Sequence, residues 1–386
     1  MHTRSRLQLD ITGRVLTNTF RSAGRVNNVD VPQVALLPSD SGATDAFGLT
    51  ARQTQLGAAM SLTGVLGGTL SGDVDLDFFG GVQNAAGDRR LFPEPRLRTV
   101  RARITWPGTE IMVGADVPLI SPLNPVSVAA TGTPNFSGAG NLWNWLAQAR
   151  VAHEIAVTHL GHTAVHWGVQ AAALSPFAGV QAPGEQDGVD AGERSGRPAL
   201  EARAHASWGD DDILTGASDA SIATNGGEIG VGVHQGWLAV GQLPLQTSQA
   251  LALDFRVSLA PKVEIRGEGY TGHVLRGLGG GGIGQAFGRA AAGALLGPPL
   301  RDRAGWAQLN VQVHPTLLVG SGCGVDVVDQ ADRPLRQRNT VCAAHVLWRL
   351  ADPFLVGLEY RHFTTRYLPS GIGRAGHLNV AIGFDL

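Results

Sequence analysis

Apolar and polar residues alternate along most of the chain, in segments that run to ten residues or more. The last segment, from Leu378 to Leu386, shows the alternation clearly, and similar segments span 71–80, 147–157 and 251–259. Successive side chains of a strand point to opposite faces, so each predicted strand has one apolar and one polar face. The length of these segments and the rows of charge on their polar faces favour a barrel around water over a soluble β-sandwich.

The alternation predicts sixteen strands. They span 7–20, 49–63, 69–80, 96–106, 109–117, 147–158, 162–174, 199–208, 212–222, 248–260, 262–275, 305–314, 316–327, 337–350, 353–366 and 375–386. The ninth position has two candidates, because residues 227–240 also alternate and could replace 212–222.

Short and long connections follow one another in turn. The short ones include 107–108, 160–161, 209–211 and 351–352, whereas the long ones are 21–48, 81–95, 118–146, 175–198, 276–304 and 328–336. This is the pattern of a transmembrane β-barrel with short periplasmic turns and long extracellular loops. We therefore predict an all-β fold, a single antiparallel barrel of about 16 strands over residues 1–386.

Composition supports a barrel and excludes other classes. Charged residues make up 16% of the chain, below the roughly 25% of soluble domains. No apolar run reaches the roughly 18 residues of a membrane-spanning helix. A formal net charge of −2 argues against a nucleic-acid partner. An outer-membrane protein needs a signal peptide; none is visible, and we infer that it has been removed.

Few residues point to a cofactor or a metal, and we expect neither. His153 and His159 are six residues apart but lack further ligands nearby. The glycine-rich stretch within 276–304 has no strand–helix–strand context for a phosphate loop, so we interpret it as an extracellular loop. Cys323 and Cys342 lie on adjacent predicted strands, and both a disulfide and two free thiols remain open.

Several motifs resemble the DcaP-like outer-membrane porins, a family associated with dicarboxylate uptake. The resemblance covers nearly all of 49–386. The motifs are Asp75-Leu76-Asp77-Phe78-Phe79-Gly80-Gly81, Leu97-Arg98-Thr99-Val100-Arg101, Ser121-Pro122-Leu123-Asn124-Pro125, Gly138-Ala139-Gly140-Asn141-Leu142-Trp143-Asn144, Gln148-Ala149-Arg150, Gly267-Glu268-Gly269-Tyr270-Thr271-Gly272, Gly305-Trp306-Ala307-Gln308, and Glu359-Tyr360-Arg361 with Thr365-Arg366-Tyr367.

The resemblance implies a homotrimer that passes small anions, in contact with outer-membrane lipid and lipopolysaccharide. Three features depart from the family. The chain ends on Phe384-Asp385-Leu386 instead of an aromatic residue, it shows no N-terminal helical extension, and Ala115-Asp116-Val117 replaces the expected polar and aromatic residues. The last departure leaves the substrate specificity open.

The function of a porin depends on the charges in its lumen and on the width of its constriction. The polar faces offer as pore-lining candidates Arg101, Arg103, Arg150, Arg203, Arg256, Arg266, Arg361, Asp75, Asp77, Glu268 and Glu359. Arg101, Arg103 and Arg150 flank the ends of loop 118–146 and are the strongest candidates for attracting a carboxylate. Alternatively, these charges only pair across the wall and stabilise the barrel.

Loop 118–146 is long and rich in proline, and we expect it to fold inward as the constriction. Its candidate residues are Asn124, Asn141, Trp143 and Trp145; the two tryptophans could instead pack against the wall.

The sequence therefore predicts a passive outer-membrane channel for small polar, anionic solutes and no enzyme activity. An outer-membrane barrel enzyme would need a nucleophile and base on the outer wall, whereas His166 and His345 fall on the polar side. A structural barrel sealed by its loops is the third hypothesis. Conductance separates the channel from both alternatives.

Overall fold

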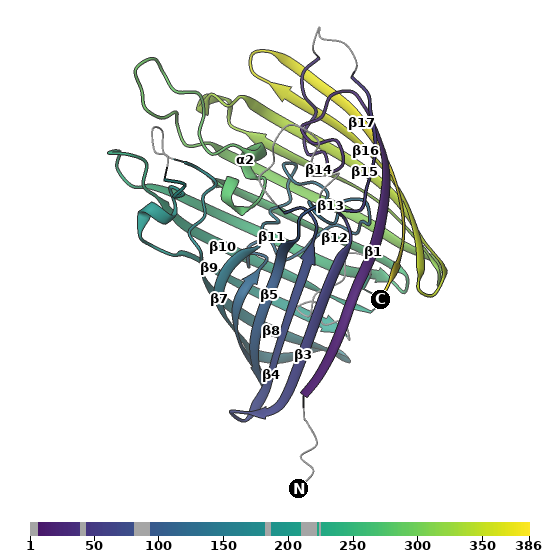
Figure 1. Cartoon of the computed structure of the whole chain (residues 1–386). Coiled ribbons are helices and arrows are strands. Elements are labelled where there is room, and N and C mark those ends of the chain that lie inside the picture. Colours follow the sequence, from purple (N-terminus) through teal and green to yellow (C-terminus); the bar gives the residue numbers. More distant parts are fainter. Residues whose placement is uncertain (1–6, 39–43, 81–92, 182–186, 210–221, 224) are drawn as a thin grey trace.

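The fold is one closed antiparallel β-barrel with sixteen strand positions (Figure 1). The computed structural model describes residues 7–38, 44–80, 93–181, 187–209, 222–223 and 225–386. In chain order the strands are β1 (Leu7–Ala23), β2 (Ala46–Thr50), β3 (Gln55–Val65), β4 (Gly68–Asp77), β5 (Arg96–Trp106), β6 (Thr109–Asp116), β7 (Leu146–Leu160), β8 (Thr163–Leu174), β9 (Ala199–Gly209), β10 (Gly226–Leu238), β11 (Gln246–Ala260), β12 (Val263–His273), β13 (Arg301–His314), β14 (Leu317–Val328), β15 (Arg336–Ala351), β16 (Phe354–Tyr367) and β17 (Gly371–Asp385).

The first strand closes the barrel. β1 pairs with β17 over Arg14–Ala23 and, on its other edge, with both β2 and β3. β2 and β3 therefore share one position, interrupted at residues 51–54, where the sequence predicted a single strand over 49–63. Closure leaves no free edge, which a sheet in hydrocarbon requires because every backbone amide must be paired.

The short helical pieces all lie in the loops. They are η1 (Glu193–Ser195), η2 (Arg276–Leu278), η3 (Gln330–Asp332) and the turn α2 (Gly281–Gly284). None of the described helices has the length and apolar character to cross a membrane.

The predicted strand positions are confirmed, with one correction. The ninth position belongs to β10 (Gly226–Leu238), which is the alternative candidate over 227–240. Most of 212–222 lies outside the described residues. The connection from β9 to β10 therefore runs over 210–225 and is longer than the predicted turn at 209–211.

Turns and loops collect at opposite ends of the barrel. We call the end with β5–β6, β7–β8 and β15–β16 connections the turn end, and the opposite one the loop end. Two connections depart from this division: 368–370 at the loop end is as short as a turn, and 210–225 at the turn end is as long as a loop. The chain begins and finishes its strands at the turn end, because β1 starts and β17 ends there (Figure 1).

The outer and inner faces follow the alternation. Outward-facing leucine, valine and isoleucine residues are exposed over most strands, as on β11 with Leu251 and Leu253. The inner face carries the charges: by register, the carboxylates of the described strands all lie on it. The two cysteines form a disulfide, Cys323–Cys342, on the outward face of β14 and β15.

Candidate solute pathway

The loop between β6 and β7 folds into the barrel. Residues 117–145 are buried at most positions, although the segment has no regular secondary structure and its backbone amides need partners. Wall side chains supply them. The Glu201 carboxylate accepts from the amides of Leu119 at 2.6 Å and Ile120 at 3.3 Å.

We call residues 117–145 the inner loop. Further along it, other wall side chains also accept hydrogen bonds from the loop. The Glu268 carboxylate accepts from the Leu123 amide at 2.8 Å and from the Ser121 hydroxyl at 2.5 Å. The Ser127 hydroxyl donates to Glu359 at 2.7 Å. These contacts anchor the inner loop to β9, β12 and β16, so these acids hold the loop instead of facing water.

Apolar side chains also pack the inner loop against the wall. Phe136 stacks on Trp306 of β13, with ring centroids 5.8 Å apart. Val126 and Val128 join the buried cluster of Leu16, Leu318, Leu347, Leu355 and Ala381. Gly140 lies so close to β13 that a Cβ there would stand 2.4 Å from the Gly305 carbonyl carbon. One side of the lumen is therefore filled by protein.

The arginines beside the inner loop are buried and paired. We call this side, β9 to β17, the packed arc. Arg203 bridges Glu228 and Asp254, and its side chain is 0% exposed. Arg256 and Arg266 share Glu264 at 2.7 and 2.6 Å. A buried ion pair of this kind is already desolvated and its charge neutralised, so it does not offer charge to a passing solute.

Arg361 belongs to the packed arc as well. Its guanidinium lies 3.3 Å from Glu359 and donates to the Asn135 side chain at 3.2 Å. Of the candidate lining residues, six lie in this arc. Arg266, Arg361, Glu268 and Glu359 contact the inner loop, whereas Arg203 and Arg256 bind carboxylates of the wall.

The wall from β4 to β7 is different, and we call it the open arc. Part of its inward charge remains in contact with solvent: the side chains of Arg101, Arg103 and Asp73 are 20%, 17% and 17% exposed, whereas Arg150 and Asp116 are 9% and 6% exposed. Arg101 and Arg103 both bind Asp73, at 2.8 Å each. Arg101 also reaches Asp116 at 3.4 Å, and Arg150 reaches it at 3.2 Å.

The open arc thus gathers three guanidiniums around two carboxylates. Arg101, Arg103 and Arg150 share Asp73 and Asp116. Glu110 lies on the same face nearer the turn end, where the Thr105 hydroxyl donates to it at 3.5 Å. The cluster at the centre of the arc carries one positive charge in excess and can attract an anion, because part of each Asp73 partner remains hydrated.

The other two predicted acids lie further up the same wall. Asp75 pairs with Arg98 at 3.0 Å and Asp77 with Arg96 at 2.5 Å. Both therefore lie closer to the loop end than the cluster of Arg101, Arg103 and Arg150. Asp75 is the register partner of Thr99, and a register shift after it places Asp77 opposite Arg96.

Trp145 forms the border between the inner loop and the open arc. Its ring lies 5.0 Å from the Arg96 guanidinium and 4.9 Å from that of Arg98. Trp143 contacts Trp145 edge-on at 5.3 Å and donates to the Ser137 hydroxyl at 2.6 Å. Trp145 therefore sits beside charged wall residues, where a cation–π contact orients the guanidiniums.

The two asparagines predicted for the constriction lie within the inner loop. The Asn141 amide donates to the Asn124 side chain at 3.2 Å and to the Asn135 carbonyl at 3.1 Å, and Asn141 is 1% exposed. Both stabilise the loop against itself, and Asn141 is shielded from solvent.

A hollow of about 430 Å³ lies at the turn end of β5 to β9. Its inward-facing lining includes Glu110, Glu154, His166, His205 and Ser207. Glu154 and His166 lie 2.7 Å apart and are each about two-fifths exposed. This hollow adjoins the open arc along β6 and β7, so polar, hydrated groups continue from the arc toward the turn end.

The anchoring role of the wall residues was not predicted from the sequence. Gln53 holds Thr131 and Gly132 of the inner loop at 2.9 Å each, and Gln308 accepts from Val126 at 2.7 Å. For Gln308, a glutamine between Ala307 and Leu309 was the available signal. It does not distinguish a residue facing water from one facing an inward loop.

Comparison with solved structures identifies the fold. The outer-membrane channel DcaP of Acinetobacter baumannii is similar over 100% of this chain and 99% of its own, with a TM-score of 0.71 and 12% identity. An anion-selective porin from Comamonas acidovorans gives 0.54 and 13%, over 98% of this chain and 100% of its own. OmpT of Vibrio cholerae, in a trimer form, gives 0.52 and 10%, over 99% and 100%.

No family profile and no curated protein matches the sequence. At these identities the likeness defines the fold, which is that of outer-membrane porins and channels. The resemblance seen in the sequence is confirmed at that level.

Proposed function

We propose that this protein is a passive outer-membrane pore for small anionic solutes, dicarboxylates among them, which pass along the open arc. The turn end then faces the periplasm and the loop end the exterior. The observation that carries the proposal is the solvent contact of Arg101 and Arg103, which share Asp73, in contrast to the buried Arg203. The anion-selective porin among the similar structures agrees with it.

The pathway works through positioning and charge alone. A dicarboxylate entering the arc meets Trp145 with Arg96 and Arg98 first, and then the cluster of Arg101, Arg103 and Arg150. Guanidiniums bind carboxylates bidentately, but each here also has a carboxylate partner. Binding is therefore weak, which lets the solute leave as readily as it enters.

The test is single-channel recording of the purified protein in a planar bilayer. We expect discrete current steps, a reversal potential in a salt gradient that reports anion preference, and a smaller current after succinate is added. A reversal potential that reports cation preference would contradict the proposed anion selectivity. The proposal that the protein is a pore would still stand.

A sealed structural barrel is the second candidate, and the filled packed arc favours it. Correctly folded, inserted protein without current steps would support this candidate and exclude the pore. An outer-membrane enzyme would also be silent in the bilayer, but would turn over lipid or peptide substrates added to the outer side.

We also propose a homotrimer. The trimer form of the similar Vibrio cholerae protein supports it, as does the wall of β2 to β6, in which β4, β5 and β6 have 8 to 11 residues. Outward Phe47 and Leu49 on this wall are 77% and 61% exposed. Current steps in groups of three and a trimer mass in detergent would support it; independent single steps would contradict it.

A further inference from the structure

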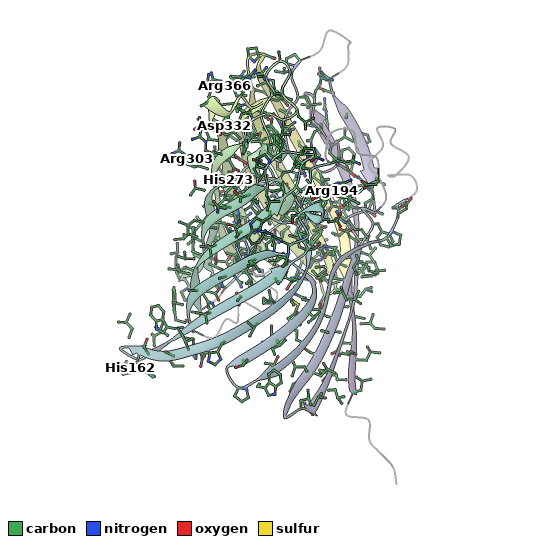
Figure 2. The ribbon with its side chains drawn as sticks, turned by 90° about the vertical axis from the view of Figure 1, so that its left-hand side faces the viewer. His162, Arg194, His273, Arg303, Asp332 and Arg366 are labelled. Atoms are coloured by element: carbon green, nitrogen blue, oxygen red, sulfur yellow. A yellow bond between two sulfur atoms is a disulfide. The ribbon has the colours of Figure 1, made fainter. Side chains whose placement is uncertain are left out.

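Three arginines form a row on the outside of the barrel. Arg303 lies on β13, Arg338 on β15 and Arg366 on β16, and all three are exposed. They share one level, since Arg303 pairs with Val327 of β14, Val327 with Arg338, and Arg338 with Arg366. Figure 2 shows Arg303 and Arg366 on the same outer side, toward the loop end. We call these residues the arginine row.

The arginine row lacks acidic partners. Within the described part of the chain, none of its three residues forms an ion pair, whereas inward arginines such as Arg101 and Arg203 do. Arg374 of β17 adds a fourth unpaired charge one level below, beside Thr364. Unpaired guanidiniums at a surface are suited to phosphate or carboxylate groups from outside the chain.

The height of the row matches the border of a membrane. Trp348, an outward aromatic of β15, lies ten residues from Arg338, or about 33 Å along a strand. At a usual tilt of about 40°, this spans about 25 Å, the height of the apolar band of outer-membrane barrels. The outward residues between them are uncharged: Thr340, Cys342, Ala344 and Val346. The row therefore lies where outer-leaflet headgroups begin.

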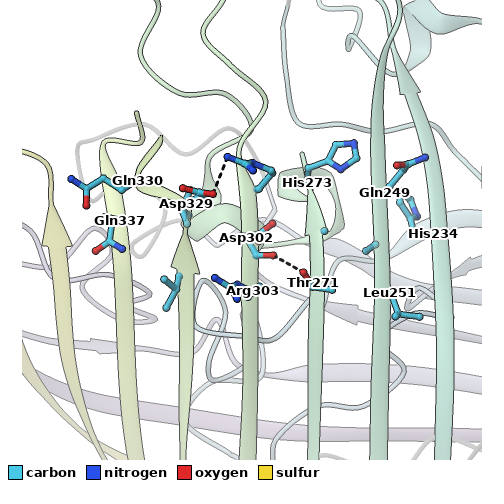
Figure 3. Close-up of a pocket in the computed structure, with 15 residues that line it drawn as sticks. His234, Gln249, Leu251, Thr271, His273, Asp302, Arg303, Asp329, Gln330 and Gln337 are labelled. Carbon is cyan, nitrogen blue, oxygen red and sulfur yellow. Dashed lines mark hydrogen bonds and ion pairs between the residues drawn. The ribbon is translucent and has the colours of Figure 1, made fainter. Parts of the chain in front are cut away.

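A polar hollow of about 830 Å³ adjoins the row on the outer surface of β11 to β15 (Figure 3). Its lining includes Gln249, His273, Arg301, Arg303 and Gln330. Arg301 is already occupied, at 2.8 Å from Asp329 and 2.9 Å from Asp332. Arg303 thus supplies the free positive charge of this hollow, because Asp329 is paired with Arg301 and Asp302 accepts from the Gly282 amide. The amides and imidazole offer hydrogen bonds to hydroxyl-rich groups.

From this arrangement we infer that the arginine row binds the phosphate groups of a phosphorylated outer-leaflet glycolipid of the lipid A type, with sugar hydroxyls in the adjoining hollow. A second copy of the chain fits less well, because the carboxylates of the described strands lie on the inner face. The strands of its outer wall would bring no acid to meet the row, and the outer Asp329, directly after β14, is already bound to Arg301. The inference rests on the outer-membrane location proposed above, and is independent of conduction.

The experiment measures binding of bis-phosphorylated lipid A to the full chain in detergent by native mass spectrometry. The variant R303Q/R338Q/R366Q is compared with R197Q/R289Q/R333Q, which removes the same charge from exposed loop positions. We expect the row variant to lose roughly 100-fold in affinity, as the neutralisation of three surface arginines implies. The loop variant should bind like the wild type. The single variant R338Q provides a smaller loss should the triple variant not fold.

Four outcomes would overturn the inference. The first two are wild-type affinity in the row variant and equal binding of dephosphorylated lipid A. The third is complete displacement of lipid A by millimolar inorganic phosphate, which would indicate a site for free phosphate. The fourth is loss of subunit association with unchanged lipid binding in the row variant, which would indicate a subunit interface. Conductance is recorded on the same variants. Because the row lies outside the lumen, failure of the pore proposal would not alter the lipid result.

Discussion

Arginine residues of the inner face have two different environments. Arg203 is surrounded by the packed arc and neutralised by Glu228 and Asp254. Arg103 has the same alternating sequence context, but faces a part of the lumen that the inner loop leaves open. The difference comes from what lies across the lumen, and only the solvated arginine can act on a solute.

The shared carboxylate of the open arc permits a test with opposite signs. Asp73→Asn leaves Arg101 and Arg103 without their common partner and should increase anion preference. Arg103→Gln removes a positive charge and should decrease it. Each should change the anion-to-cation permeability ratio about two- to fivefold, as an interaction of roughly 0.5–1 kcal/mol implies. The reversal potential in a salt gradient measures both.

The control for this pair is Arg303→Gln, which removes the same charge from the outer face. It should leave the reversal potential unchanged. Shifts of Asp73→Asn and Arg103→Gln in the same direction would mean that the barrel was distorted, and that the open arc does not select ions through its charge.

Among the elements, the inner loop decides how much of the lumen stays open. Its position depends on a close approach of its backbone to β13. Gly140 has φ +109°, and a Cβ there would stand 2.4 Å from the Gly305 carbonyl carbon. Gly140→Ala should therefore displace the loop, lower the free energy of unfolding by about 1–3 kcal/mol and give a noisier single-channel current. Urea unfolding and current variance measure the two effects.

Gly161→Ala is the matched control for the loop. Gly161 also has a positive φ, +63°, but a Cβ added there would have no heavy atom within 4 Å. It should lose stability through its backbone alone and keep a quiet current. Equal current noise in both variants would show that the contact between Gly140 and Gly305 does not hold the inner loop in place.

The disulfide joins two strands that are already paired. Cys323 and Cys342 are register partners on the outer face, 19 residues apart in sequence. Replacing both by serine should lower the free energy of unfolding by roughly 2–4 kcal/mol, the usual contribution for a loop of this length. Conductance should not change, because the lumen is on the other side of the wall. An altered conductance would contradict this placement.

At the scale of the whole molecule, strand number and direction place both chain ends at the turn end. A peptide tag after Leu386 should therefore be protected from antibody in intact cells and accessible after the outer membrane is opened. A tag in the loop between β12 and β13, at residue 293, should be accessible in both cases. Labelling of the terminal tag in intact cells would reverse the proposed orientation.

Much of the barrel followed from local chemistry. A period of two assigns each residue to one face, and connection lengths assign the ends, so strands such as 96–106 and 353–366 and the even count needed no tertiary information. The two alternating segments at 212–222 and 227–240 could not be ranked in this way. The choice of β10 depends on its pairing with β9 and β11.

The sequence by itself determined an all-β barrel with charges inside, an apolar outer face and a long loop after the fifth predicted strand. Only the tertiary structure decided which of the inward charges meet water. Glu268 binds the backbone of the inner loop, whereas Asp73 remains partly hydrated beside Arg101 and Arg103. Alternation reports the face of a residue, but burial depends on what packs against that face, and an inward loop contacts wall residues far away in sequence.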